Sequence, residues 1–579
     1  MEEFSFKTRA MALDRMRSEE FDLLIIGGGI TGAATARDAV TRGLRVALVE
    51  KRDFAWGTSS RSSKLIHGGL RYLENFELGL VFEALSERAH LLKTAPHLVR
   101  PLKFFVPVYS GTGRGRFVLS VGMWLYDFLA LFRAPGFHKR LSRKRMLEAV
   151  PFLKEEDLKG GFQYYDAGMW DDQLVIETLR SAAKRGAAVA NYAEAMTPIW
   201  KDDRIVGFRL AARRLCDGEL NQSEDMAVRA KRVVVCAGPW TDEVGKKLSP
   251  QWGPWLKPSK GIHLVFDLRR IPVSGALVMG HPSDGRIAFV IPRPDFGSGI
   301  AIVGTTDGPA PGPPEKAGVE ENDVDYLMNL LYRYFPKLNL KKKDIISAYV
   351  GVRPLMGDGP NPGEMESVSA SHLVARPKGV EALQKVSREH FIGKGPGETV
   401  IVAGGKYTTH RQMAKEIVDF TIASSSPPLP KKLKPSKTSE PVNLQVRPSA
   451  VEACRVEAQQ RGITLPPELV QRYGAEALDI MEEGKKKIPG FPADPEGFCV
   501  LAAQFRHAIR TGMVLHLEDF YLRRTPLFMT RRDHGLPWAE GLSSVWAEEL
   551  GKGEEERKRE VERLKEEVER REAWRGKLG

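Results

Sequence analysis

The sequence predicts an α/β fold with a parallel sheet near its N-terminus and a separate helical domain near its C-terminus. Between residues 21 and 49 an apolar run, a helical stretch and a second apolar run follow one another, and this βαβ pattern implies a parallel sheet. Beyond residue 441 the apolar residues recur at helical spacing instead. The chain has 579 residues, more than a single hydrophobic core accommodates, so we expect two or three domains.

The first three elements follow from local patterns. Phe21–Ile26 is apolar, too short for a helix and followed by three glycines, which indicates a buried strand. A helix is expected over Ile30–Thr41, closed by Gly43, and a second strand over Arg45–Val49. The later strand candidates are Arg232–Cys236, Ile287–Ile291, Ile300–Val303 and Val400–Val402. Because these candidates are widely spaced, we expect the sheet to be assembled from segments that leave the domain and return.

The remaining boundaries follow from composition. Residues 1–20 are expected to form a short helix or a loose tail ahead of a main domain at 21–422. Residues 423–440 are rich in Pro, Ser and Lys and read as a linker, because such a composition cannot bury a core. Helical periodicity over 441–550, as in Ala450–Arg461 and Ala502–His516, predicts a small helical domain. Residues 551–579 form a charged helical tail with a sparse stripe at Val561, Leu564 and Val568, which we interpret as a solvated helix.

Charge and cysteine content bear on the partners and the cellular location of the protein. The net charge is +13 and the isoelectric point is near 9.3, which favours anionic partners. The four cysteines have neither CxxC nor metal-ligand spacing, so the sequence predicts reduced thiols, a cytoplasmic protein and no metal site. The N-terminus lacks the apolar core of a signal peptide, and no apolar run is long enough to span a membrane.

A glycine motif follows the first strand. Gly27, Gly29 and Gly32 have the spacing G-x-G-x-x-G, which allows a tight turn, close approach of the backbone to a pyrophosphate and helix–strand packing. The helix that begins at Ile30 and Thr31 then directs its N-terminal amides at the phosphates. Glu50 ends the second strand, where a carboxylate accepts hydrogen bonds from ribose hydroxyls. The sequence therefore predicts a Rossmann-type dinucleotide-binding domain.

The position of two further glycine strands favours FAD over NAD as the dinucleotide. These strands are Val233–Trp240 (VVVCAGPW) and Val400–Lys406 (VIVAGGK). An NAD enzyme would normally keep its N-terminal Rossmann unit compact and contiguous. The dispersed pattern instead resembles the two-domain flavoenzymes related to D-amino-acid oxidase, in which FAD lies extended through the fold.

Five further motifs resemble a flavoenzyme family with a defined substrate. Thr58–Tyr72 reads TSSRSSKLIHGGLRY, which could be a polar loop alone or a loop that approaches phosphate and flavin. This segment resembles, nearly residue for residue, the signature of the FAD-dependent glycerol-3-phosphate dehydrogenases. Four other motifs resemble the same family in the same order, namely ALSERAHLLKTAPHL (84–98), YVGVRPL (349–355), GGKYTTHR (404–411) and HLEDFYLRRTPL within 508–527. The resemblance covers roughly residues 20–530.

The resemblance implies the site residues and the rest of the fold. It implies a Rossmann-type FAD-binding domain interleaved with an antiparallel-sheet substrate or cap domain, plus the C-terminal helical domain. Arg71, Tyr72 and Arg353 match the substrate pocket, and Arg388 matches it less closely because residues 357–386 resemble an insertion. The positions matched to the cofactor, besides the glycine turn and Glu50, are Thr58, Ser59, Ser60, Ser62, Ser63, Leu65, His67, Ala237, Gly238, Trp240, Gly405, Lys406 and Thr408.

The chemistry of the implied reaction agrees with these residue types. Oxidation of sn-glycerol 3-phosphate to dihydroxyacetone phosphate needs fixed cations for the phosphate, and arginine can grip phosphate through two hydrogen bonds. A base must also take the hydroxyl proton while a hydride passes to flavin N5. His67 is the candidate base, or it only hydrogen-bonds the flavin. Lys406 would stabilise the developing alkoxide or the charge of reduced flavin.

Three alternative functions remain to be weighed. A glycerol-3-phosphate oxidase would have the same site and reduce oxygen in place of membrane quinone, and no motif separates the two. An amino-acid or sarcosine oxidase of the same fold would not need the arginine set. A non-enzymatic FAD or nucleic-acid binder, which the basic isoelectric point suggests, is the least favoured alternative, because the sequence contains no recognised nucleic-acid module or aromatic-interleaved basic groove. The oligomeric state stays open, and a homodimer is compatible with the sequence.

One apolar segment bears on location. Phe117–Phe132 contains Trp124 and Tyr126, is interrupted by Asp127 and is flanked by basic residues. Such a helix either lies on an anionic lipid surface or is buried in the substrate domain. The first alternative predicts a cytoplasmic protein attached peripherally to the cytoplasmic membrane, where quinone is the electron acceptor.

Overall fold

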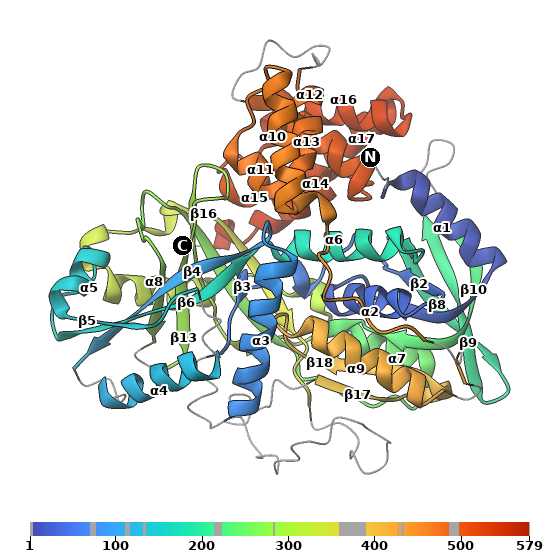
Figure 1. The fold of residues 1–579 in the computed structure, drawn as a ribbon, viewed down its shortest axis with the longest axis horizontal. Coiled ribbons are helices and arrows are strands. Elements are labelled where there is room, and N and C mark those ends of the chain that lie inside the picture. The colour runs from blue at the N-terminus through green and yellow to red at the C-terminus, as the bar shows by residue number, and fades with distance from the viewer. Residues whose placement is uncertain are drawn as a thin grey trace.

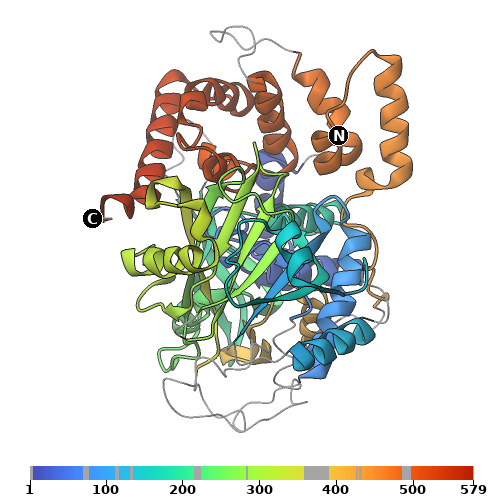
Figure 2. The same ribbon diagram turned by 90° about the vertical axis from the view of Figure 1, so that its left-hand side faces the viewer.

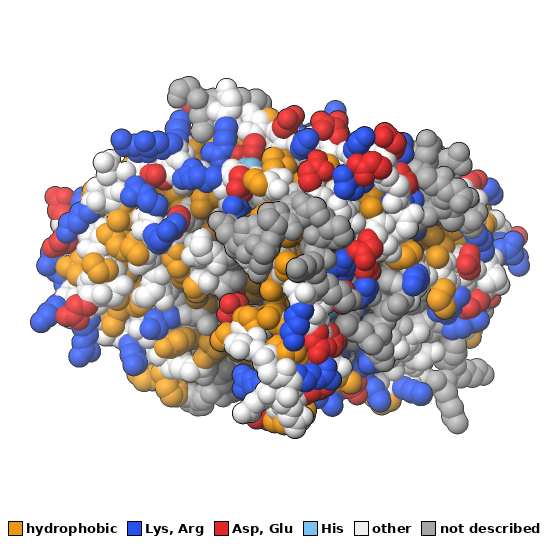
Figure 3. Space-filling view, turned by 90° about the horizontal axis from the view of Figure 1, so that it is seen from above, with side chains coloured by type: hydrophobic (Ala, Val, Ile, Leu, Met, Phe, Trp, Pro, Cys, Tyr) orange, Lys and Arg blue, Asp and Glu red, His pale blue; other side chains and the backbone are white. Residues whose placement is uncertain are grey.

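The protein consists of two sheets side by side with a helical domain lying across them, as the computed structural model shows (Figures 1 and 2). The structure describes residues 4–69, 77–110, 116–130, 135–213, 223–281, 284–357, 390–425, 428–429, 433–485 and 497–577. Basic side chains are spread over the face that carries the helical domain, and acidic ones lie among them (Figure 3). The excess of positive charge is therefore not gathered into one patch on the described part of that face.

The first sheet has the parallel core that the sequence predicts. Its described strands are β1 (Glu20–Ile26), β2 (Val46–Val49), β7 (Ala188–Ala190), β8 (Ala193–Lys201), β9 (Arg204–Arg213), β10 (Ser223–Val235), β17 (His390–Lys394) and β18 (Val400–Gly404). They pair in the order β17-β18-β10-β1-β2-β7, with β9 and β8 continuing from β10. β18, β10, β1, β2 and β7 are parallel, so segments almost four hundred residues apart form one sheet, as expected.

Helices cover both faces of this sheet, which explains why β1 is apolar along nearly its whole length. Leu23 and Ile25 face α2 (Ile30–Thr41), which packs against α6 (Asp171–Lys184) and α9 (His410–Ala423). Leu24 and Ile26 face the opposite layer, formed by α1 (Phe6–Ser18), α7 (Thr241–Leu248) and the β8–β9 hairpin.

The N-terminal segment is a packed helix and not a loose tail. α1 contacts β7 and β10, and Arg9 on this helix is 2% exposed. The Arg9 guanidinium donates hydrogen bonds to the carbonyl oxygens of Asn191 at 2.9 Å and Arg213 at 2.7 Å. The mean hydropathy of α1 is low, so the sequence alone does not distinguish this buried helix from an exposed one.

The second sheet is mainly antiparallel. Its described strands are β3 (Leu65–Ile66), β4 (Val99–Tyr109), β5 (Lys139–Leu141), β6 (Leu158–Met169), β11 (Ser259–Asp267), β12 (Ala276–Gly280), β13 (Ile287–Arg293), β14 (Ile300–Gly304), β15 (Gly308–Pro309) and β16 (Ile345–Arg353). The order is β15-β11-β14-β13-β12-β4-β6-β3, with β16 on β11 and β5 on β6. The strands expected at 287–291 and 300–303 lie here and not in the nucleotide-binding sheet. α8 (Glu321–Tyr334) and α5 (Arg143–Ala149) pack on this sheet.

The C-terminal helices lie above both sheets (Figure 1). They are α10 (Pro448–Gln460), α11 (Pro467–Tyr473), α12 (Ala477–Glu483), α13 (Phe498–Thr511), α14 (Leu517–Arg523), α15 (Leu527–Thr530), α16 (Ala539–Leu550) and α17 (Glu554–Glu572). The interpretation of α17 as a solvated tail is wrong. Val561, Leu564 and Val568 are 3%, 1% and 5% exposed and join the core formed by α13, α14 and α16.

The segment expected as a linker follows the surface of the nucleotide-binding domain. After α9 ends at Ala423, Lys434 donates its backbone N–H to the Arg42 carbonyl oxygen at 3.0 Å. Ser436 Oγ donates to Asp38 Oδ1 at 2.5 Å. The connection is therefore fixed to α2 at these points, although it has no core of its own.

α4 (Arg116–Leu129) lies on the side of the molecule opposite the helical domain, and α3 (Leu78–Thr94) runs between the two (Figure 1). Neither expected alternative describes α4 by itself, because its two faces differ. Met123 and Tyr126 are buried, whereas Trp124 and Phe128 are 65% and 63% exposed. Within the described residues, no helix combines the length and the apolar character that crossing a membrane requires.

Candidate active site

The predicted cofactor residues meet at one edge of the parallel sheet. The Gly27 N–H donates to the Val49 carbonyl oxygen at 2.9 Å, and the Cys236 N–H donates to the Ile26 carbonyl oxygen at 2.8 Å. The glycine turn, Glu50 and the segment Ala237–Trp240 therefore follow three neighbouring strand ends. Gly405 follows the end of β18 at the same edge. In open α/β sheets ligands bind at this carboxyl edge.

The glycine turn has no room for side chains. Gly27 has a φ of +116°, and a Cβ there would lie 2.4 Å from the Cys236 carbonyl oxygen. A Cβ on Gly32 would lie 2.0 Å from the Gly27 carbonyl oxygen, so α2 can begin this close to β1 only with glycine. The Ile30 N–H at the start of α2 donates to Ser59 Oγ at 3.0 Å. The turn thus has the close packing that the motif predicts for a pyrophosphate site.

Glu50 braces the glycine turn from β2. Its carboxylate accepts the Gly28 N–H at 2.7 Å and the Arg52 N–H at 2.9 Å. Burial raises the pKa of the Glu50 carboxyl, and the two N–H donors oppose that effect. The carboxylate is therefore placed by the backbone, at the position where ribose hydroxyls would reach it.

The serine-rich loop joins the two sheets. Thr58 Oγ1 donates to the Val352 carbonyl oxygen on β16 at 2.5 Å. Ser62 Oγ donates to Asp171 Oδ2 at 2.7 Å, and Ser63 Oγ hydrogen-bonds His263 Nε2 at 2.8 Å. Three of the hydroxyls that the sequence assigns to the cofactor are therefore engaged by the protein, and they fix the loop between the nucleotide-binding edge and the second sheet. Ser60 and Leu65 belong to the same segment, with Leu65 on β3.

His67 directly follows β3, and its side chain is half-buried. The adjacent Gly68 N–H donates to Tyr126 Oη at 3.0 Å and to Asp166 Oδ1 at 3.3 Å. Asp166 is buried and forms an ion pair with the buried Arg88. The backbone beside His67 is therefore anchored to a buried charge pair. Arg71, Tyr72 and Arg388 lie outside the described residues, as does the expected insertion at 357–386 apart from its first residue.

Arg353 ends β16 and faces a group of oxygen acceptors. Its guanidinium donates to Thr305 Oγ1 at 2.9 Å, to the Thr306 carbonyl oxygen at 3.2 Å and to Asp307 Oδ1 at 3.2 Å. Its side chain is 23% exposed. Asp307 balances part of its charge, so an anionic substrate would compete with this carboxylate.

The last glycine strand brings three more predicted residues to the sheet edge. Gly405 has a φ of +95°, Lys406 is half-buried, and Thr408 is 5% exposed just before α9. Burial and the nearby Glu416 raise the pKa of the Glu83 carboxyl on α3, and Lys406 is close enough to oppose this shift. The ring of Trp240 lies against Trp56, with centroids 5.6 Å apart.

The sequence did not identify the residues of the second sheet that hold the serine-rich loop. His263 on β11 stacks on Tyr349 with ring centroids 4.7 Å apart, and Tyr349 Oη donates to the Ser62 carbonyl oxygen at 2.9 Å. Burial lowers the pKa of His263 to about 3, and the nearby Arg353 and Lys64 act in the same direction, so this imidazole is neutral. The signal was a histidine inside the otherwise apolar run of β11, where a buried polar ring needs a partner.

A second missed group is the buried pair Lys64–Asp171. Lys64 Nζ lies 2.5 Å from Asp171 Oδ1, and both side chains are almost fully buried. Tyr407 Oη also donates to the Asp171 carbonyl oxygen. This pair therefore links the serine loop to α6 and to the segment that carries Lys406.

Comparison with known proteins settles the family. Residues 22–417 match the family described as FAD dependent oxidoreductase, and residues 461–557 match the C-terminal domain of alpha-glycerophosphate oxidase. This chain belongs to the FAD-dependent oxidoreductases. Its cofactor is FAD, and the Rossmann-type domain, the second sheet and the helical domain agree with the predicted fold.

Several relatives of this flavoenzyme share most of its length. It is 34% identical to an alpha-glycerophosphate oxidase of Streptococcus pyogenes over 580 residues, which cover 92% of each chain. It is 37% identical to an aerobic glycerol-3-phosphate dehydrogenase of Staphylococcus aureus over 407 residues, covering 70% of this chain and 67% of the relative. A glycerol-3-phosphate dehydrogenase from Bacillus halodurans, solved with FAD, matches 98% of both chains with a TM-score of 0.75 and 28% identity.

The residues present suit FAD. Gly27 and Gly32 have no room for a Cβ, so the turn keeps the glycines that allow a backbone to approach a pyrophosphate closely. Glu50 stands at the end of β2 for the ribose. His67 follows β3 and Lys406 follows β18, and both side chains are half-buried. In the described part of the chain, no group of His, Cys, Asp and Glu could hold a metal ion.

Proposed function

We propose that this flavoenzyme oxidises sn-glycerol 3-phosphate to dihydroxyacetone phosphate and delivers the electrons to a membrane quinone. The observation that carries the proposal is that one serine-rich loop contacts three predicted parts of the site. Ser59 accepts from Ile30 at the glycine turn, and Thr58 donates to Val352, which precedes Arg353. Ser62 and Tyr407, the residue after Lys406, both hydrogen-bond Asp171. The names of the relatives from S. pyogenes, S. aureus and B. halodurans support the substrate. Bound FAD supplies the hydride acceptor, and the protein supplies binding, orientation and proton transfer.

In the proposed reaction Arg353 binds the phosphate or a hydroxyl of the substrate. Its guanidinium is fixed by Thr305 and Thr306, so little conformational entropy is lost on binding. Arg71, Tyr72 and Arg388 are proposed to complete the pocket. Arg353→Ala should raise KM for glycerol 3-phosphate strongly, because a lost charged hydrogen bond costs about 2–5 kcal/mol. Arg353→Lys is the control that keeps the charge, and an unchanged KM in the alanine variant would remove Arg353 from the pocket.

His67 is proposed as the base that takes the substrate hydroxyl proton, with Lys406 stabilising the developing negative charge. The anchored backbone at Gly68 supports this role, because a base must be held in place. His67→Gln should lower kcat, keep FAD bound and abolish the acid-side pKa of the kcat/KM profile. A pH profile that stays unchanged would assign the base elsewhere, and Lys406 would be tested next.

The relatives carry the names of both oxidases and dehydrogenases, so the choice of quinone as electron acceptor rests on this chain's own surface. The exposed apolar side chains on α4 support quinone, because a quinone dissolved in the bilayer is reached only from its surface. The His138 ring contacts Trp124, and its neighbour Phe137 is 57% exposed. The residues that follow include exposed basic side chains, namely Lys139, Arg140, Arg143, Lys144 and Arg145. This combination suits the surface of an anionic membrane.

Steady-state turnover separates the two acceptors. The purified protein should be yellow and oxidise glycerol 3-phosphate faster with a soluble quinone than in oxygenated buffer alone. The reverse result would make the protein a glycerol-3-phosphate oxidase. Activity on amino acids with none on glycerol 3-phosphate would overturn the proposed substrate as well.

A further inference from the structure

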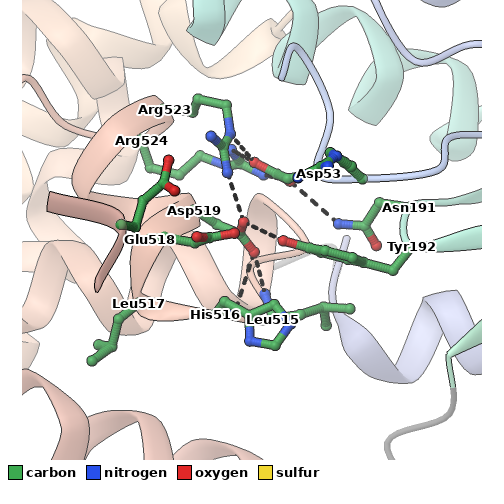
Figure 4. Close-up of polar contacts among 12 residues, drawn as sticks. Asp53, Asn191, Tyr192, Leu515, His516, Leu517, Glu518, Asp519, Arg523 and Arg524 are labelled. Atoms are coloured by element: carbon green, nitrogen blue, oxygen red, sulfur yellow. Dashed lines mark hydrogen bonds and ion pairs between the residues drawn. The ribbon is translucent and has the colours of Figure 1, made fainter. Parts of the chain in front are cut away.

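A buried charge network lies where the helical domain meets the nucleotide-binding sheet (Figure 4). Its centre is Asp53, which follows β2 three residues after Glu50 and is 0% exposed. Its carboxylate accepts a hydrogen bond from Arg523 Nε at 2.5 Å. It also accepts from both terminal nitrogens of Arg524, at 2.8 and 2.9 Å. Two arginines of the helical domain are therefore directed at one carboxylate of the cofactor domain.

Both arginines and their neighbour Asp519 make further hydrogen bonds. Arg523 also donates to Asp519 Oδ1 at 2.8 Å, one turn earlier on α14, and Asp519 accepts from Tyr192 Oη at 2.6 Å. Arg524 donates in addition to the Gly512 carbonyl oxygen at 2.7 Å. Burial alone would raise the pKa of Asp53, but Arg524 and Arg523 together hold it below its usual value. The carboxylate is thus ionised and fixed in position.

The two residues after Asp53 contact the glycine turn. A Cβ added to Gly28 would lie 2.7 Å from Phe54 Cδ1, so the Phe54 ring closes the back of the turn. The Ala55 N–H donates to the Gly28 carbonyl oxygen at 3.1 Å. The position of residues 53–55 is therefore transmitted directly to the backbone that would hold the pyrophosphate.

A second connection reaches the same ring from the N-terminus. Phe4 stacks on Phe54 with centroids 6.0 Å apart and an interplanar angle of 19°. The Phe4 N–H donates to the Arg510 carbonyl oxygen at 2.9 Å, and the Met513 N–H donates to the Phe4 carbonyl oxygen at 2.8 Å. The helical domain thus contacts the segment behind the glycine turn both through Asp53 and through Phe4.

We propose that the C-terminal helical domain positions the FAD-binding turn, and that Asp53 is the positioning residue through which it acts. A turn made of glycines is conformationally permissive, so it needs support from outside itself to be ordered before FAD binds. Arg523 and Arg524 supply this support by fixing Asp53. The helical domain thus supports the cofactor site through Asp53, from the side of the turn that faces away from the cofactor.

The test compares two buried ion pairs between the same domains. Asp53→Asn breaks the pair behind the turn. The matched control is Glu476→Gln, which breaks the pair of Glu476 with Arg180 on α6, whose nitrogen and oxygen lie 2.5 Å apart. FAD release from the diluted holoenzyme is followed by flavin fluorescence, and hydrogen exchange is measured on the FAD-loaded protein over residues 27–29 and 53–60.

Asp53→Asn should release FAD at least tenfold faster than Glu476→Gln and show faster exchange in both segments, at a temperature where both variants keep the wild-type circular dichroism. Equal release from the two variants, or wild-type release from Asp53→Asn, would overturn the proposal. If Asp53→Asn fails to fold, Phe4→Leu tests the second connection without burying a charge. Faster release from Phe4→Leu than from Glu476→Gln then supports the proposal, and equal release overturns it.

Discussion

The exposed face of α4 gives a prediction whose size follows from the structure. Trp124 and Phe128 are 65% and 63% exposed, so about two thirds of each side chain is available to lipid. Complete burial of such a side chain contributes about 1.5–3 kcal/mol, so the pair should contribute roughly 2–4 kcal/mol to membrane binding. Because each 1.4 kcal/mol is about tenfold, replacing both with Glu should weaken partitioning roughly 30- to 1000-fold. Leu125 packs partly against the core and should be kept.

The assay is sedimentation with vesicles of anionic lipid at low and high salt, together with turnover on a soluble dye acceptor. The control replaces Met196 and Trp200 on β8 with Glu, since they are 44% and 47% exposed and give the same change in charge. The α4 variant should lose membrane binding and keep dye turnover, while the control sediments nearly as wild type. Wild-type sedimentation of the α4 variant, or equal loss in the control, would refute attachment through α4.

Three further predictions concern the cofactor turn and the helical domain. Gly32→Ala should abolish FAD binding, because its Cβ would lie 2.0 Å from a backbone oxygen; a wild-type ratio of flavin to protein in the absorption spectrum would contradict this. Leu564→Ala should lower the free energy of unfolding by about 2–5 kcal/mol, against about 0.5 kcal/mol or less for the exposed Lys565→Ala, as measured by denaturant titration. Burial raises the pKa of the Glu567 carboxyl, but Arg571 and Arg570 outweigh it and lower the pKa to about 2. The ionised carboxylate therefore stabilises the fold fully above its ordinary pKa of 4.5, and this stability is lost as the pH falls toward 2. The difference in stability between wild type and Glu567→Gln should therefore shrink as the pH is lowered from about 6 to about 3, and a constant difference would exclude this ion pair as its source.

The sequence predicted those features that depend on a short stretch of chain. The strand, turn and helix at residues 21–41 were expected almost residue for residue, because apolar periodicity and glycine spacing are local properties. Glu50 could be placed as well, since it directly follows the next strand of the same unit. The resemblance of five ordered motifs extended this to FAD and to the helical domain, and the family match confirmed both.

Other features required the tertiary structure. The stripe on α17 has the pattern of a surface helix, and only its packing against α14 and α16 shows that it is buried. Likewise, the apolar runs at 287–291 and 300–303 identify strands but not the sheet that they join. An apolar pattern indicates which side chains are buried, but it does not indicate which element packs against them.

By itself the sequence determined the dinucleotide-binding unit, because glycine spacing and apolar periodicity are properties of adjacent residues. The cofactor and the family followed from the resemblance of its ordered motifs to a known family. Only the tertiary structure decided which polar groups meet. His263 lies beside Ser63, and Asp53 pairs with Arg523 across a separation of 470 residues. Such pairs are energetically significant because both partners leave water together, and that condition exists only in the folded chain.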